Sequence, residues 1–111
     1  MALKHATSGE VVDIQPLGDT IDEVPSTAIV RDDRIEVMRL VLPAGKTVPE
    51  HRVEGPISVH CLEGEVEVFA HNEAKTLRAH QLMYLSGGVA HSIHALADAS
   101  VLVTVVRIES P

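Results

Sequence analysis

Short runs of β-branched and aliphatic residues, separated by turn residues, dominate the chain from residue 35 onwards. The first clear run, Ile35–Leu42, ends at the turn signal Pro43-Ala44-Gly45. Further strand-like runs follow: Ile57–Leu62, Glu65–Phe69, Thr76–Ala79, Leu82–Leu85, His91–Ala95 and Val101–Ile108. Many short strands with turns between them are typical of an all-β sandwich or barrel.

The polar positions within these runs indicate which strand faces are covered. Glu65–Val68 alternates strictly, which predicts one wet face. Val101–Val106 and Leu82–Leu85 are apolar on both parities, which predicts strands covered on both faces. A small sandwich has one interior, so the second cover must come from the N-terminal segment or from another subunit. We therefore expect a homodimer.

The pattern before residue 35 is weaker. We expect a frayed arm over residues 1–10, a short strand over Val11–Ile14, and an extended piece over Ser26–Val30. Residues 1–34 are thus interpreted as an arm with short strands that packs on the barrel or on a partner subunit. Residues 35–108 form the barrel, and the whole chain is one domain.

The composition excludes several classes of protein but does not indicate an activity. A chain of 111 residues, 45% hydrophobic and 23% charged, is typical of one globular domain. The formal net charge of -7 disfavours binding to nucleic acid or to an anionic membrane surface. With one cysteine the chain has no internal disulfide, and no stretch reaches the roughly 18 apolar residues of a membrane span. We expect a cytoplasmic protein.

The stretch from Gly45 to Gly64 carries a motif. Gly45, His51 and Gly64 resemble, at full spacing, the first conserved motif of the cupins: Gly, five residues, His, one, His, three, Glu, six, Gly. Ser86–His91 resembles the second motif, in which Gly88 and His91 match. The resemblance covers roughly residues 36–106. It implies a small single-domain cupin of the cupin-2 type, an RmlC-like jelly roll built as a double-sheet β-barrel.

Two positions depart from the first motif, because Val53 stands in place of the second His and Ile57 in place of the Glu. In metal-binding cupins, the resemblance implies, these positions and two further histidines converge on iron, manganese, nickel, copper or zinc. Here only His51 and His91 remain as ligands if any metal is bound, and two histidines make a poor cage. The metal site is therefore interpreted as degenerate.

Other candidate ligands are excluded by strand parity. His60 and His94 each lie three residues beyond the position they would have to serve, so they point to the opposite face. Cys61 lies about 13 Å along the strand from Ile57, at ~3.3 Å per residue, and is interpreted as a buried, inert side chain. We expect the carboxylates Glu63, Glu65, Glu67 and Glu73 to form a solvated edge.

The sequence therefore predicts a cavity lined by His51, Val53, Ile57 and His91. Apolar side chains complete it according to register: Leu40, Leu42, Met83 or Leu85. The two histidines are satisfied by each other, by backbone or by water, or bind a small ligand in a metal-free pocket, or hold a transition metal completed by other ligands.

Three functions fit this cavity. The first is a small-molecule-binding cupin with a degenerate metal site, acting as a sensor or accessory module. The second is a metal-dependent oxygenase or isomerase that uses His51 and His91. The third is a structural homodimer with a vestigial pocket. Whether the protein is an enzyme stays open, because the fold hosts many activities and the chain has no recognisable nucleophile.

Overall fold

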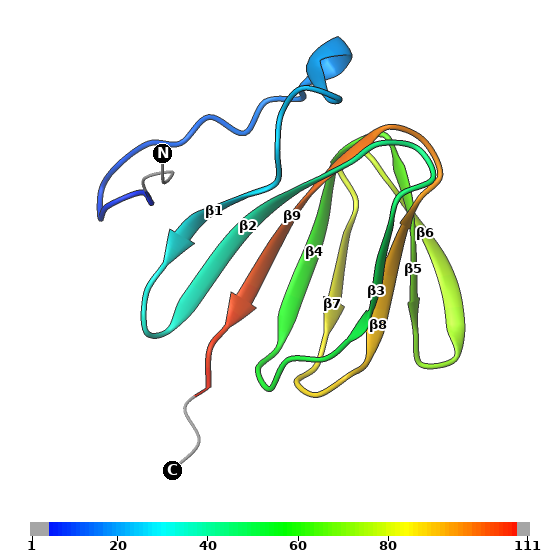
Figure 1. The fold of residues 1–111 in the computed structure, drawn as a ribbon. Helices are drawn as coiled ribbons and strands as arrows, with labels where there is room; N and C mark the ends of the chain where they lie inside the picture. The colour runs from blue at the N-terminus through cyan, green and yellow to red at the C-terminus, as the bar shows by residue number, and fades with distance from the viewer. Residues whose placement is uncertain (1–4, 109–111) are drawn as a thin grey trace.

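The computed structural model describes residues 5–108, within which short strands form two antiparallel sheets (Figure 1). A single 3-10 turn, η1 (Gly18–Thr20), precedes them in this part of the chain. The strands are β1 (Thr27–Arg31), β2 (Ile35–Leu42), β3 (Thr47–His51), β4 (Ile57–Glu63), β5 (Glu65–Ala70), β6 (Glu73–Arg78), β7 (Leu82–Leu85), β8 (His91–Ala95) and β9 (Ala99–Val106). The prediction of an all-β, double-sheet architecture is confirmed.

The two sheets differ in width. Sheet A has five strands in the order β1-β2-β9-β4-β7, and sheet B has four in the order β3-β8-β5-β6. Figure 1 shows the two sheets facing each other, with the N-terminal segment beside the β1 edge of sheet A. Apart from the consecutive pairs β1–β2 and β5–β6, neighbouring strands in each sheet are distant in sequence, so most of the pairing joins remote parts of the chain.

The core lies between the inner faces of the sheets. Val66, Val68 and Ile93 of sheet B are almost fully buried, as are Val59 and Val101 of sheet A. The alternation seen along Glu65–Val68 places the two valines inward and the two glutamates outward. Burial of aliphatic side chains at roughly 25 cal/mol per Å² is the main term that stabilises such a core.

Two glycines of the motif stretch are required by close approach of the backbone. A Cβ at Gly64, where φ is +77°, would lie 2.1 Å from the carbonyl oxygen of Asp98. A Cβ at Gly55 would lie 1.7 Å from the carbonyl oxygen of Val106. Only glycine fits at these two positions, so both corners of the stretch are fixed by packing against the two ends of the central strand β9, at Asp98–Ala99 and at Val106.

The structure differs from the sequence prediction at three elements. Val11–Ile14 forms no strand, and Val11 is 94% exposed. Strand β6 begins at Glu73 rather than Thr76, and β9 runs two residues earlier than expected. Residues 1–4 of the expected arm lie outside the described part of the chain, whereas the backbone N–H of Ala6 donates to Ile29 O at 2.8 Å.

The outer face of sheet A is only partly covered. Residues 5–20, here called the N-terminal arm, line hollows over β1 and β2. At the other edge of the sheet, Leu82 is 60% exposed and Tyr84 is 67% exposed. The expectation that β7 is covered on both faces is therefore wrong within a single chain. No helix among residues 5–108 is long and apolar enough to cross a membrane.

Candidate functional site

The structure brings His51 and His91 together. They are direct cross-strand partners on β3 and β8, so both side chains leave the same face of sheet B. Their ring centroids are 4.5 Å apart, and the rings are tilted by 56°. His91 is 3% exposed, whereas His51, on the edge strand, is open to solvent. The pair therefore extends from the barrel interior, at His91, to the solvent-exposed edge of sheet B, at His51.

The backbone fixes the tautomer of both imidazoles. His51 Nδ1 lies 3.1 Å from Pro49 O, and His91 Nδ1 lies 3.0 Å from Val89 O. A carbonyl oxygen only accepts, so each Nδ1 carries the proton and donates it. Each Nε2 is then left with its lone pair, and neither has a hydrogen-bond partner among residues 5–108.

Val53 and Ile57, the two positions that depart from the motif, carry apolar side chains. Ile57 is 4% exposed and pairs with Leu85 on one side and Val105 on the other. Val53 is partly buried against the core, and its carbonyl accepts a hydrogen bond from Gly88 N at 2.8 Å. Neither side chain has an atom that can coordinate a cation.

The donor set does not fit a resident transition metal. Within residues 5–108, no group of three or more His, Cys, Asp or Glu side chains is placed to hold an ion. His60 and His94 face away from the interior, as parity predicts: His60 pairs with Leu102, and His94 Nδ1 lies 2.7 Å from Thr47 Oγ1. Two imidazoles alone leave most of a coordination sphere to outside ligands.

Cys61 is fully buried and points into the core. Burial raises the pKa of its thiol above the ordinary value, and the Glu63 and Glu65 carboxylates act in the same direction, against a hydrogen bond to Glu63 O. A protonated, buried thiol is a poor nucleophile and a poor ligand.

A small cavity lies between β5, β6 and β7, with aliphatic side chains on one side and His71, Glu73 and Lys75 on the other. Its volume is about 110 Å³. Its lining includes Ala70, the cross-strand partner of His91, and Leu85, the partner of Ile57. Met83 also lines it, whereas Leu40 and Leu42 pack in the core cluster. The cavity therefore reaches the strand next to His91 through Ala70, and its aliphatic side is formed by Val68, Met83 and Leu85.

A second polar cluster, which we call the arm anchor, lies on the outer face of sheet A. Its side chains are Arg39, Glu63 and Ser100. Arg39 is 8% exposed, and its Nη2 is 3.6 Å from Glu63 Oε2 and 3.4 Å from Ser100 Oγ. Arg39 also donates to Gln15 O in the arm. Glu63 accepts hydrogen bonds from Leu17 N at 2.7 Å, Gly18 N at 3.0 Å and Ser100 Oγ at 2.6 Å.

The arm anchor corrects the prediction that Glu63 belongs to a solvated edge. The register of β4 against β9 shifts between Cys61 and Glu63, so a bulge turns Glu63 to the outer face, opposite Ser100. The sequence did hold a signal, since Arg39 interrupts an otherwise apolar part of β2 and a buried guanidinium needs an acidic partner. Parity counting alone cannot locate a bulge.

The electrostatics of the arm anchor favour the ionised carboxylate. Burial acts to raise the pKa of Glu63, but hydrogen bonds from Ser100, Leu17 and Gly18, together with the charge of Arg39, outweigh it. The pKa of Glu63 therefore lies below its ordinary value, and the pair stays charged at neutral pH.

Comparison by sequence gives no relative. No protein-family model matches the chain, and no curated protein matches it.

Comparison by structure gives a consistent fold. A conserved protein of unknown function from Streptococcus pyogenes superposes with a TM-score of 0.77 at 20% identity, covering 99% of this chain and 100% of that one. A cupin superfamily protein from Desulfitobacterium hafniense gives 0.75 at 16% identity, covering 88% and 95%. An RmlC-like cupin family protein with a double-stranded β-helix fold, from Methanocaldococcus jannaschii, gives 0.73 at 14% identity, covering 89% and 94%.

These neighbours define the fold of the chain as that of the cupins, the double-stranded β-helix or jelly roll. The expected fold class is thereby confirmed. At such identities the likeness carries no activity, since one fold hosts many functions.

Proposed function

We propose that the chain is a small-molecule-binding protein of the cupin fold, with a degenerate metal site and a sensor or accessory role. The observation that carries the proposal is the pair of backbone-fixed imidazoles, His51 and His91, which present two unpartnered Nε2 atoms beside apolar side chains. Preorganised polar groups in an otherwise apolar setting are typical of ligand sites.

The chemistry of the pair suggests the class of ligand. Two neutral Nε2 atoms accept hydrogen bonds, so they suit a hydroxyl or amine group. The aliphatic side of the cavity of about 110 Å³, formed by Val68, Met83 and Leu85, suits a short aliphatic body, and its other side carries the polar side chains His71, Glu73 and Lys75. We therefore expect a small alcohol or amine, or a larger molecule that inserts such a group at the rim.

The two alternatives are less well supported. A metal-dependent oxygenase or isomerase needs a third protein ligand, and residues 5–108 offer none beside the pair. A structural protein with a vestigial pocket has no need for two oriented imidazoles, one of them nearly fully buried. We further propose a homodimer, supported by the exposed apolar residues of β7, and a reducing compartment, supported by the free thiol of Cys61.

Proton NMR of the histidine Cε1–H resonances tests the binding proposal. Titration with isobutanol and isobutylamine should shift the signals of His51 and His91, and the His91→Leu variant should lose the response. His94→Ala, on the outer face of the same strand, is the matched control and should respond like the wild type. No shift with either compound, or equal shifts in His91→Leu, would contradict the proposal.

Metal analysis of protein purified without an affinity tag separates this function from the metal-dependent one. We expect iron, manganese, nickel, copper and zinc to be far below one ion per chain. A near-stoichiometric metal that disappears in the His51→Ala, His91→Ala double variant would instead establish the metal-dependent alternative.

A further inference from the structure

We propose that two copies of the chain associate through the outer faces of sheet A, so that Leu82 and Tyr84 of each copy enter the hollow beneath the other copy's N-terminal arm. The inference rests on the homodimer proposed above and defines its interface.

The projecting part of this face is the edge strand β7. Leu82 and Tyr84 are 60% and 67% exposed. They pair with His60 and Ser58 of β4, so both side chains point to the outer face of sheet A. A tyrosine and a leucine therefore stand side by side on one exposed edge, and tyrosine is enriched at protein interfaces.

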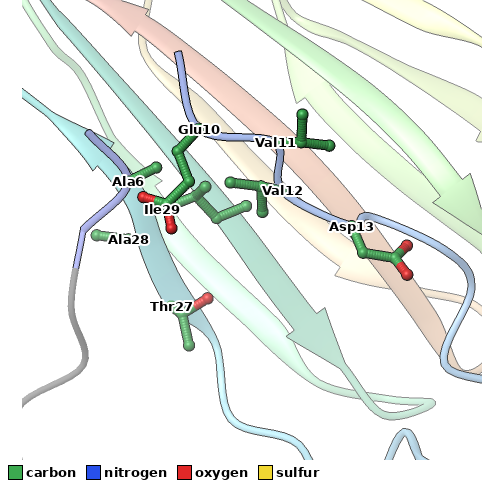
Figure 2. Close-up of a pocket in the computed structure, with 8 residues that line it drawn as sticks. All are labelled: Ala6, Glu10, Val11, Val12, Asp13, Thr27, Ala28 and Ile29. Carbon is green, nitrogen blue, oxygen red and sulfur yellow. The ribbon is translucent and has the colours of Figure 1, made fainter. Parts of the chain in front are cut away.

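The receiving part lies at the opposite edge of the same face. A hollow of about 530 Å³ opens between the N-terminal arm and strands β1, β2 and β9. Its apolar lining is contributed by Val12, Ile14, Ile29, Val30, Val37 and Leu102. Figure 2 shows a neighbouring hollow of about 360 Å³, where Val12 of the arm lies over Ile29 of β1.

The hollow is held open by contacts at both ends of the arm. At one end Ala6 N donates to Ile29 O at 2.8 Å. At the other end the arm anchor binds the backbone of Leu17 and Gly18 through Glu63. The arm therefore bridges the sheet surface, which leaves apolar side chains such as Leu102 beneath it incompletely covered.

The cross-strand register places projection and hollow at the same height. Tyr84 lies in the row that runs through Ser58, Thr104 and Val37 to Val30. Leu82 lies in the next row, which runs through His60, Leu102 and Arg39 to Thr27, and Thr27 lines the neighbouring hollow of Figure 2. Val30, Val37 and Leu102 all line the hollow. Projection and hollow thus share rows and differ only in which edge of the sheet they occupy.

A second copy fits this arrangement by symmetry. A two-fold axis lying between two such faces and parallel to the central strand β9 keeps the height of each row and exchanges the edges of the sheet. It sets β7 of each copy over the β1–β2 edge of the other, so one contact is made twice. A different partner would need its own projection and its own hollow at this spacing. A stable interface takes roughly 800 Å² from each partner, so the contact must extend across the face between the two edges.

The test compares oligomeric states by light scattering at micromolar concentration. The wild type should have the mass of two chains. Leu82→Lys and, separately, Val12→Glu should weaken association at least tenfold and give monomers. Phe69→Lys is the matched control, because Phe69 is 41% exposed on the outer face of sheet B and its replacement should leave the dimer intact. All substituted side chains are partly exposed, and circular dichroism will show whether each variant is folded.

Mixing the two monomeric variants tests the pairing itself. In a mixed dimer one contact is wild type and the other joins a lysine to a glutamate, so mixing should restore the dimer. Restoration would establish that projection meets hollow, and failure to restore it would overturn that pairing. A wild-type dimer that persists in Leu82→Lys and in Tyr84→Lys would overturn this interface but not the homodimer, whereas a monomeric wild type would overturn both. The NMR titration of the histidine pair reports on ligand binding independently of these outcomes.

Discussion

Two groups of polar side chains are built into this small barrel, and they are satisfied in opposite ways. In the arm anchor, Glu63 accepts three hydrogen bonds and faces Arg39, so almost every polar atom has a partner; Arg39 Nε is the exception among residues 5–108. In the histidine pair, each ring uses one nitrogen for a backbone carbonyl and leaves the other without a partner in this part of the chain.

This difference distinguishes side chains that stabilise the fold from side chains that are available to bind a ligand. A closed network of hydrogen bonds holds chain segments together, and its removal costs stability. An oriented group with a spare lone pair stabilises the fold little, but it is ready for an outside molecule. The arm anchor therefore belongs to the fold, and the open histidine pair supports the proposal of ligand binding.

The largest expected loss of stability comes from removing the carboxylate of the arm anchor. Glu63→Ala leaves the Arg39 guanidinium buried without its counter-ion, and the two side chains are only 10% and 14% exposed in the wild type. Breaking such a pair costs about 3 kcal/mol of the free energy of unfolding. Urea denaturation monitored by circular dichroism measures this cost.

The exposed ion pair Lys75–Glu73 provides the control for this variant. Its side chains are 62% and 65% exposed, so Lys75→Ala should change the free energy of unfolding by less than about 0.5 kcal/mol. Equal effects of Glu63→Ala and Lys75→Ala would contradict the assignment of the arm anchor to the fold.

The second-largest expected change in stability comes from adding metal-binding side chains next to the histidine pair. The double variant Val53→His, Ile57→Glu restores the donors that the cupin motif has at these positions. Without metal the variant should be less stable than the wild type, because the Ile57 site is buried. With Ni²⁺ at about 100 times its dissociation constant, binding should return about 2.7 kcal/mol. Thermal unfolding with and without Ni²⁺ measures the gain.

The third substitution His91→Ala, added to the double variant, should abolish the nickel effect. If the double variant gains no stability from nickel, then positions 53 and 57 do not face the histidine pair, and the proposed cavity is wrong.

The smallest expected effect is a pH dependence confined to the arm anchor. Because the pKa of folded Glu63 is lowered, the folded chain binds fewer protons than the unfolded chain, and stability rises with pH in that range. The contribution of Glu63 is full above the ordinary value of 4.5 and is lost as the pH falls through the folded value.

Unfolding free energies measured from pH 7 to pH 3 should therefore fall more steeply for the wild type than for Glu63→Gln. Asp32, whose pKa is lowered chiefly by hydrogen bonds from Arg34 N and Ile35 N, contributes to both slopes, so the difference isolates Glu63. Parallel slopes would show that Glu63 is not held in its charged form by the anchor.

Much of the fold was predictable because strand formation depends on the local pattern of β-branched, apolar and turn residues. The β-branched runs gave β2, β7 and β8 with their observed bounds, and the extended piece at Ser26–Val30 became β1 within one residue. Val11–Ile14 did not become a strand although three of its four residues are apolar, because a run of β-branched residues forms a strand only where it pairs with a sheet, and no pairing is made there. The predicted strand starts later than β6 because Glu73 and Lys75 are charged and the first three residues of β6 are exposed.

The candidate site was predictable only in part. Spacing suggested that His51 and His91 share a cavity, and strand parity correctly excluded His60 and His94. The hydrogen bonds to Pro49 O and Val89 O, which decide the tautomer, depend on local backbone geometry that no spacing shows.

The sequence by itself determined the class of fold, the corner glycines Gly55 and Gly64, and the apolar side chains at Val53 and Ile57, because these follow from residue type and local spacing. Only the tertiary structure decided that Glu63 turns outward to bind Arg39 and the arm, and that Leu82 and Tyr84 share rows with a hollow at the opposite edge. A bulge in one strand and the order of strands in a sheet are set by contacts between residues far apart in the chain. The local sequence pattern therefore does not predict the bulge or the strand order.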